Sequence, residues 1–218
     1  MISVLGKHEQ FETDVLERLK KGKFLDFLVF GGGTMLRLCH ELPRYSVDLD
    51  FWFAKKKDFE KVFFQLGDFL KKYYQTTDAK NKHFTLLYEL KRPISERRLK
   101  IEIRKEIVTK GVESKIAFSR FSTQQVLVNA LSLSESAKRK IQAMHSRHEI
   151  RDFFDLEFLL RCGAEVSLEK KEKVYLEKRV KDFKKTDYSV SLGSLLEKKL
   201  REHYIRHGFS HLKNFLSY

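Results

Sequence analysis

The sequence has little of the residues that break or cross-link a chain. Only two of its 218 residues are proline, and only two are cysteine. So few prolines favour long regular elements, because proline continues neither a helix nor a central strand. The cysteines, Cys39 and Cys162, are far apart and lie in apolar helical contexts. This predicts small buried side chains in a reducing compartment, not a disulfide or a metal pair.

Long apolar runs are also missing. No run approaches the roughly 18 residues that would span a membrane, and residues 1–20 mix charged with apolar side chains from the start. We therefore expect a cytoplasmic protein with neither a membrane span nor a signal peptide. Hydrophobic residues make up 42% of the chain and include 19 phenylalanines, which argues against disorder and predicts a folded globular protein.

Positive charge, in contrast, is abundant. The formal net charge is +14, and the isoelectric point is near 9.6. A chain of this charge attracts polyanions, and nucleic acid is the commonest polyanion in a cytosol. The lysine-rich segments 169–185 and 197–207 also contain acids, so a well-solvated helical surface is the alternative interpretation.

The first 131 residues mix helical and strand periodicities. Apolar residues recur at helical spacing in some segments and alternate with polar residues in others. The expected helices cover residues 9–20, 34–41 and 58–74, and the expected strands cover residues 26–30, 47–53, 83–90, 99–108 and 125–130. These elements predict an α+β domain over residues 1–131.

From residue 132 onward the pattern is entirely helical. Ser132 and Glu135 have the spacing of a capping box, in which the two residues satisfy backbone N–H groups at the start of a helix. The expected helices cover residues 132–147, 149–161, 168–184 and 192–207. We therefore expect a helical C-terminal region over residues 132–218.

Two aspartates, separated by a single residue, lie in the segment VDLDFWF, residues 47–53. Apolar residues alternate with Asp48 and Asp50, which predicts a strand with both carboxylates on one face and their Cα atoms about 6–7 Å apart. Glu102 is a polar-face carboxylate of a second predicted strand. Carboxylates on neighbouring strands can share divalent cations.

A run of three glycines, Gly31–Gly33, follows the predicted strand at 26–30. Backbone without Cβ atoms lets N–H groups approach phosphates closely, and the positive end of the following helix favours anions. No Gly-Lys-Ser/Thr follows, so this is not a P-loop. Taken alone, the pattern also fits an ordinary glycine turn beside two surface aspartates.

Two blocks of sequence resemble a known family. The first is GGT at 32–34 followed by PRYSVDLDF at 43–51, and the second is KRKIQAMHSRHEIRDFFDLEFL at 138–159. Together they resemble the polymerase-β-type nucleotidyltransferases in the form found in the AbiEii/AbiGii toxin family. The resemblance implies a mixed β-sheet core with flanking helices, followed by a helical region that completes the active-site cleft.

The resemblance also implies roles for individual residues. The metal ligands would be Asp48, Asp50 and Glu102, holding two Mg²⁺ ions, with Mn²⁺ as the alternative metal. Lys140 would bind a nucleotide phosphate, and Asp155 would position that lysine or the nucleotide. The other residues expected to bind the nucleotide are Gly32, Gly33, Thr34, Arg44 and Ser46. Glu89 and Glu106 are also strand carboxylates, so the identity of the third ligand stays open between them and Glu102.

The activity that the resemblance implies is Mg²⁺-dependent transfer of a nucleoside monophosphate from an NTP to an acceptor hydroxyl. The expected acceptor is RNA, at the 3′ end of tRNA, and the expected protein partner is a cognate antitoxin. A protein side chain is the second candidate acceptor. A non-catalytic nucleotide-binding or nucleic-acid-binding protein of the same fold and a metal-dependent phosphohydrolase are the alternative functions.

The second block leaves two interpretations open: Lys140 and Asp155 either hold the triphosphate or are ordinary surface residues of a helical hairpin. Helical spacing puts Lys140 at the edge of a packed face and puts Asp152 and Asp155 on one face of the next helix. As surface residues, Lys140 and Asp155 would each tolerate alanine with a loss under about 1 kcal/mol of stability. Arg147 either meets phosphate or forms an ion pair with a nearby carboxylate.

Overall fold

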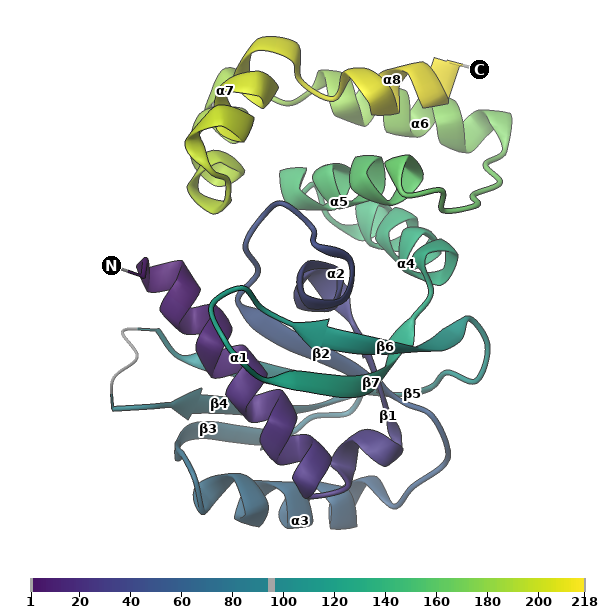
Figure 1. Ribbon diagram of the computed structural model, residues 1–218. Helices are drawn as coiled ribbons and strands as arrows, with labels where there is room; N and C mark the ends of the chain where they lie inside the picture. Colours follow the sequence, from purple (N-terminus) through teal and green to yellow (C-terminus); the bar gives the residue numbers. More distant parts are fainter. Residues whose placement is uncertain (1, 94–96, 218) are drawn as a thin grey trace. The chain divides into compact units, whose positions relative to one another are not determined.

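A computed structural model describes residues 2–93 and 97–217 of the chain. The chain divides into two compact units (Figure 1). The first comprises Met1–Glu41 and Tyr45–Leu131, and the second comprises Leu42–Arg44 and Ser132–Tyr218. The short segment Leu42–Arg44 thus belongs to the second unit, although it lies between two parts of the first in sequence.

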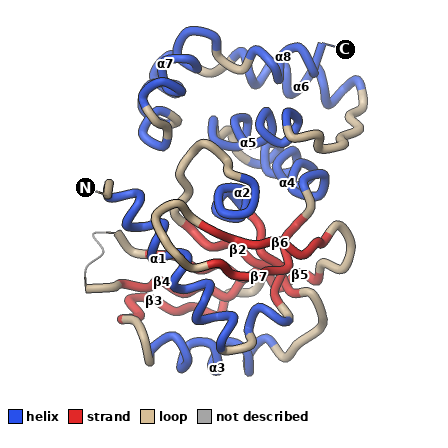
Figure 2. The backbone as a smooth tube through the Cα atoms, viewed as in Figure 1, coloured by secondary structure: helices blue, strands red, loops and turns tan. Residues whose placement is uncertain are grey.

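The first unit is built on a seven-stranded sheet with the strand order β3-β4-β5-β2-β1-β7-β6, drawn in red in Figure 2. The β2/β5 and β1/β7 pairs are parallel, and the other four pairs are antiparallel. The sheet is therefore mixed, as the resemblance implies. The strands are β1 (Leu28–Gly31), β2 (Asp48–Phe53), β3 (Gln75–Asn81), β4 (Thr85–Lys91), β5 (Leu99–Ile107), β6 (Val112–Phe118) and β7 (Gln125–Leu131).

Three helices flank this sheet: α1 (Val4–Lys21), α2 (Gly32–His40) and α3 (Phe59–Lys71). A short 3-10 helix, Phe24–Asp26, leads into β1. Ser3 is the N-cap of α1, and its hydroxyl accepts the Gly6 N–H at 3.1 Å. Its buried stripe is Phe11, Val15, Leu16 and Leu19, all fully buried, with the spacing of an amphipathic helix.

The second unit is helical. It contains α4 (Leu133–Ser146), α5 (Ile150–Arg161), α6 (Lys170–Lys181), α7 (Lys198–His207) and α8 (Ser210–Ser217), with a π-helical turn at Asp187–Ser191 and a 3-10 turn at Gly193–Leu195. The buried Glu157 of α5 accepts the Tyr204 hydroxyl and the Leu212 backbone N–H, both at 2.8 Å. One carboxylate therefore ties α7 and the start of α8 to α5.

The structure confirms the expected helices and strands up to residue 161, with shifts of a few residues at their ends. The strands β3 and β6, which are the two edge strands of the sheet, were not predicted. The segment QTTDAKN of β3 has mostly exposed side chains and no apolar alternation, and in β6 the alternating apolar side chains Ile116 and Phe118 are exposed and not part of the core. The predicted helix at 192–207 was wrong in its first half, because this part forms the short turn at Gly193–Leu195. Helix α8 was not predicted.

The cysteine prediction was wrong for one of the two residues. Helix α5 ends at Arg161, so Cys162 lies at its C-cap and is exposed. Cys39 is half-buried in α2, and burial raises the pKa of its thiol to about 12. Both thiols are free. Separately, the described part of the chain contains no helix that is both long and apolar enough to cross a membrane.

A buried carboxyl group lies in α1. Glu12 is fully buried, and neither of its carboxyl oxygens has a hydrogen-bond partner among the described residues. Burial raises the pKa of Glu12 well above its ordinary value, and the negative charges of Glu9 and Asp48 raise it further. Burial therefore favours the neutral form of Glu12 over the carboxylate in the folded protein, although Arg37 acts in the opposite direction and His8 Nε2 lies 3.6 Å from Glu12 Oε1.

Replacing Glu12 by Gln should stabilise the protein more at high pH than at low pH. A raised native pKa contributes stability that is present below the unfolded-state pKa, about 4.3, and is lost as the pH rises toward the native value. Gln cannot ionise, so the free energy of unfolding gained by Glu12→Gln should be larger at pH 8 than at pH 5 by about 1–3 kcal/mol. Urea unfolding at the two pH values measures this difference. Glu41→Gln, at an exposed position, is the control. If the two variants changed the free energy of unfolding equally at both pH values, the raised pKa of Glu12 would be contradicted.

Candidate active site

The strand pair β2/β5 brings the predicted metal ligands together. In its parallel register Asp48 lies opposite Lys100, and Asp50 lies opposite Glu102. Alternate residues of a strand share a face, so all four side chains lie on one face of the sheet. The carboxylates of Asp48 and Glu102 are 34% and 23% exposed, so a ligand from solvent can reach them.

The register separates Glu102 from the other two candidate carboxylates. Glu89 lies one strand farther away, on β4, where its carboxylate binds Arg98 at 2.7 Å and the Thr77 hydroxyl at 2.6 Å. Glu106 lies four residues beyond Glu102 on β5. Only Glu102 of the three stands directly beside Asp50, which makes it our candidate for the third ligand.

The glycine run lies against the same carboxylates. Gly31 pairs with Asp50 across β1/β2, and Gly32 has a φ of +75°. A Cβ atom at Gly32 would collide with the Asp50 carboxylate. Position 32 therefore requires glycine for two reasons: its backbone conformation and the close approach of the Asp50 side chain.

Helix α2 starts in this turn, and the helix has no side-chain cap. The hydroxyl of the buried Thr34 donates to the Asp48 carbonyl oxygen at 2.5 Å, so it fixes the backbone of β2. A phosphate contact from Thr34 would thus come from its backbone N–H, as it would from Gly33. Ser46 is half-buried in the segment before β2.

The donor chemistry of the carboxylate face fits a hard divalent cation, which prefers oxygen ligands. A positively charged side chain already lies beside these carboxylates, because the Lys100 ammonium is 3.4 Å from Asp48 Oδ2 and 3.8 Å from Glu102 Oε2. Within residues 2–93 and 97–217, no three His, Cys, Asp or Glu side chains are arranged closely enough to hold a metal ion. Metal binding would therefore require these side chains to turn toward the ion.

A second charged cluster lies within the helical unit, around Asp155. Asp155 is fully buried and forms a bidentate pair with Arg44, with distances of 2.6 Å from Nε to Oδ1 and 2.7 Å from Nη2 to Oδ2. The Lys140 ammonium is 2.6 Å from Asp155 Oδ2. Burial alone would raise the pKa of Asp155, but Arg44 and Lys140 outweigh it and hold that pKa below its ordinary value.

Asp152 extends this cluster by one turn of α5. Its carboxylate is also fully buried and binds Lys140 at 2.9 Å and Arg147 Nε at 2.7 Å. Burial opposes ionisation of Asp152 as well, yet Lys140 and Arg147 lower its pKa. Lys140 is thus held between two aspartates, and its side chain is 13% exposed.

The burial narrows the role that Asp155 can have. A fully buried carboxylate that already binds two cations can position Lys140 and Arg44, but it has no surface for a nucleotide. Arg44, expected to bind the nucleotide, is 3% exposed and is used in this pair. Of the two alternatives for Arg147, the structure shows the ion pair, and its partner is Asp152.

The sequence analysis gave no functional role to Lys100 or Asp152. Lys100 had a signal in the alternation KIEI, which puts a lysine two residues before Glu102 on the same strand face. Asp152 had a signal in its helical spacing from Asp155. The partner of Lys100 could not be read from the sequence, because Asp48 is on a different strand, and neither could the Arg44–Asp155 pair, whose residues are 111 apart. The partners of Asp152, Lys140 and Arg147, are near it in the chain.

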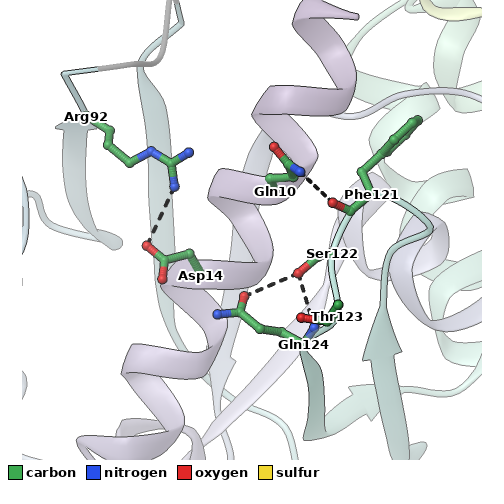
Figure 3. Close-up of a pocket in the computed structure, with 7 residues that line it drawn as sticks. All are labelled: Gln10, Asp14, Arg92, Phe121, Ser122, Thr123 and Gln124. Atoms are coloured by element: carbon green, nitrogen blue, oxygen red, sulfur yellow. Dashed lines mark hydrogen bonds and ion pairs between the residues drawn. The ribbon is translucent and has the colours of Figure 1, made fainter. Parts of the chain in front are cut away.

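A pocket of about 380 Å³ lies elsewhere in the first unit, beside α1 (Figure 3). It is lined by Gln10, Asp14, Arg92, Phe121, Ser122, Thr123 and Gln124. Many of its polar groups are used internally, since Gln10 donates to the Phe121 carbonyl and Arg92 lies 3.9 Å from Asp14. None of the predicted site residues lines it.

Gly32→Ala should destabilise the protein, whereas Gly67→Ala should not. The added methyl group at Gly32 meets the Asp50 carboxylate and strains the positive φ, so we expect a loss of about 1–3 kcal/mol in the free energy of unfolding. In α3 the nearest atom to an added Cβ at Gly67 is Tyr88 Cε1, at an ordinary 3.5 Å. Alanine there should gain about 0.5–1 kcal/mol. Chemical denaturation measures both, and a tolerated Gly32→Ala would show that Asp50 is not packed on the turn.

Asp155→Ala should cost about 3–5 kcal/mol of stability, since it leaves buried positive charges without their partner. This differs from the surface behaviour considered for Asp155 in the sequence analysis. The control on the same helix is Arg151→Ala, which removes a more exposed pair to Glu149 at 3.8 Å and should cost under about 1 kcal/mol. Thermal unfolding compares the two. Equal melting temperatures would mean that the buried cluster contributes no net stability.

Comparisons with known proteins show the family, by a family model, and the fold, by solved structures. The family model described as nucleotidyl transferase AbiEii toxin, type IV TA system, matches residues 14–215. The search of curated proteins gives no match. Among solved structures, the chain is similar to a candidate nucleotidyltransferase from H. pylori, with 20% identity, a TM-score of 0.58, and coverage of 97% of this chain and 95% of that one.

Two further crystal structures share the fold. JHP933 from Helicobacter pylori is 19% identical with a TM-score of 0.56, over 100% of this chain and 95% of that one. An antigenic nucleotidyltransferase-like protein from Paracoccidioides brasiliensis is 16% identical with a TM-score of 0.51, over 90% of this chain and 96% of that one. At these identities the likeness shows the fold alone. The family match extends over most of the sequence, and the chain therefore belongs to the AbiEii toxin family of nucleotidyltransferases.

Proposed function

We propose that the protein transfers a nucleoside monophosphate from an NTP to a hydroxyl group of RNA, with Mg²⁺ as cofactor, as the toxin of a toxin–antitoxin system. Membership of the family implies an NTP as substrate and an antitoxin as partner. The observation that carries the proposal is the β2/β5 register, which sets Asp50 beside Glu102 and Asp48 on the same face. NTPs and RNA are both abundant in the cytoplasm, where we propose that the protein acts.

Nucleotidyltransferases generally use divalent metals, and the residues that would hold them here are Asp48, Asp50 and Glu102. Two Mg²⁺ ions bound there, or Mn²⁺ in their place, would supply charge stabilisation for the phosphoryl group and activate the acceptor hydroxyl. The three carboxylates carry the negative charge that such ions need. The Thr34 hydroxyl fixes the Asp48 backbone, and Gly32 leaves room for the Asp50 carboxylate.

In the proposed reaction, the acceptor oxygen attacks the α-phosphorus of the NTP and forms a new P–O bond. The bond from that phosphorus to the oxygen that bridges it to the β-phosphorus breaks, pyrophosphate leaves with that oxygen, and the acceptor hydroxyl gives its proton to water. Lys140 would bind the triphosphate through its ammonium. Asp152 and Asp155 hold this ammonium at 2.9 and 2.6 Å, which fixes its position before a nucleotide arrives.

Charge favours RNA over protein as the acceptor. The net charge of +14 attracts the phosphate backbone. In the helical unit, α6 adds exposed basic side chains, including Lys170, Lys171 and Lys181. A folded RNA with a free 3′ hydroxyl, such as tRNA, is the acceptor that we propose. Transfer to a protein side chain is the second candidate, and a nucleotide-binding protein of this fold without turnover is the third.

One labelling experiment separates these candidates. The protein is incubated with each of the four NTPs labelled at the α-phosphate, with Mg²⁺, and with either total RNA or total protein as acceptor. Labelled RNA supports the proposal, and labelled protein supports the second candidate. Binding without any labelled product supports a non-catalytic protein, and free labelled NMP or NDP, formed by hydrolysis of the NTP, supports a phosphohydrolase. Purified tRNA with an intact or an oxidised 3′ end then tests the acceptor hydroxyl.

Asp50→Asn should reduce the transfer rate by at least about 10²-fold, the scale of losing one preorganised charge stabiliser. The substitution keeps the size of the side chain, so the fold should be retained, and circular dichroism checks this. The matched control is Asp78→Asn, which changes a solvent-accessible aspartate of the edge strand β3. If Asp50→Asn transferred nucleotide at the rate of the unaltered protein, metal catalysis at this face would be refuted.

A further inference from the structure

A lysine lies among the carboxylates that we propose as metal ligands. The Lys100 ammonium is 3.4 Å from Asp48 Oδ2 and 3.8 Å from Glu102 Oε2, so it contacts two of the three at once. Its side chain is 38% exposed, and the ammonium can therefore leave this position without unfolding the strand. A lysine is long and flexible enough to do so.

The position of Lys100 is a consequence of the fold. Asp50 lies opposite Glu102 in the parallel β2/β5 pair, so the residues two places earlier on each strand, Asp48 and Lys100, also lie opposite each other. Because alternate residues share a face, this lysine is fixed next to the carboxylates by the same register that assembles them.

We propose that Lys100 is an internal counter-cation that holds these carboxylates in the metal-free protein and competes with the divalent cation for them. This inference rests on the proposed function, because it takes Asp48 and Glu102 to be metal ligands. Like charges at this spacing repel one another, and the Lys100 ammonium offsets the repulsion. A metal ion that binds the same oxygens must displace the ammonium.

The competition has a reciprocal consequence. If metal binding weakens the hold of the carboxylates on Lys100, then Lys100 weakens metal binding by the same factor. Removing its charge should therefore move two measurable properties in opposite directions. The metal-free protein becomes less stable, because the carboxylates repel one another, while its affinity for the metal rises. Ordinary loss of packing would lower both.

The experiment measures Mn²⁺ binding to the full-length protein without nucleotide, by isothermal titration calorimetry or by the electron paramagnetic resonance signal of free Mn²⁺. Lys100→Met keeps most of the length of the unbranched side chain and removes its charge. We expect its Kd for Mn²⁺ to fall on the order of tenfold. Its melting temperature without metal should fall by about 2 °C.

The chain offers a matched control in Lys115→Met. Lys115 lies in β6 of the same sheet, is 34% exposed, and pairs with Glu113 at 3.4 Å, the distance at which Lys100 meets Asp48. Neither Lys115 nor Glu113 is among the proposed metal ligands. Its replacement should leave the Kd for Mn²⁺ unchanged. If Lys100→Met does not fold, Lys100→Gln removes the same charge with a polar side chain, and its Kd decides the question.

The outcomes separate this inference from the proposed function. If the unaltered protein binds no Mn²⁺ and transfers no nucleotide, the proposed function fails, and the inference fails with it. If the unaltered protein binds Mn²⁺ and transfers nucleotide, but the Lys100 variant has an unchanged or weaker affinity for Mn²⁺, the inference alone is overturned. A tighter Kd combined with a lower metal-free melting temperature supports it.

Discussion

The pairing of β2 with β5 is the constraint on which the candidate site depends. These strands are about fifty residues apart in the chain, yet their parallel register sets Asp48 and Asp50 beside Lys100 and Glu102. A slip of one residue would turn the side chains of one strand to the opposite face. The buried side chains Leu49, Phe51, Ile101 and Ile103 prevent such a slip, because it would expose them to water. The apolar core thus fixes the geometry of the polar face.

The two charged clusters use the same residue types in different surroundings. Around Asp48 the side chains are partly exposed, so water screens their charges and the arrangement can change when a ligand binds. Around Asp155 and Asp152 the carboxylates are fully buried, and each is bound by two cations. This cluster is fixed, because removing either partner would leave an unpaired charge in a medium of low dielectric constant. A partly exposed carboxylate face can rearrange around an ion, and an ammonium held by two buried carboxylates is in place for a phosphate, as our proposed function requires.

Much of the fold could be predicted because its strongest elements carry their own periodicity. The alternation in VDLDFWF and in LKIEI, and the helical spacing of residues 9–20, predicted β2, β5 and α1 correctly. Of the elements that were missed, the strand β3 depends on a neighbour for its stability more than on its own pattern. It exposes most of its side chains and is held by pairing with β4. Local sequence does not record such pairing.

The sequence by itself determined the family, the mixed character of the sheet, and the residue types available for chemistry, because these follow from local periodicity and from two contiguous motifs. Only the tertiary structure decided which charges meet. It set Lys100 against Asp48 and Glu102, placed Glu102 rather than Glu89 or Glu106 beside Asp50, and joined Arg44 to Asp155 across 111 residues. The physical reason is that strand register and the burial of a carboxylate arise from packing between distant segments, and electrostatic partners follow from those distances alone.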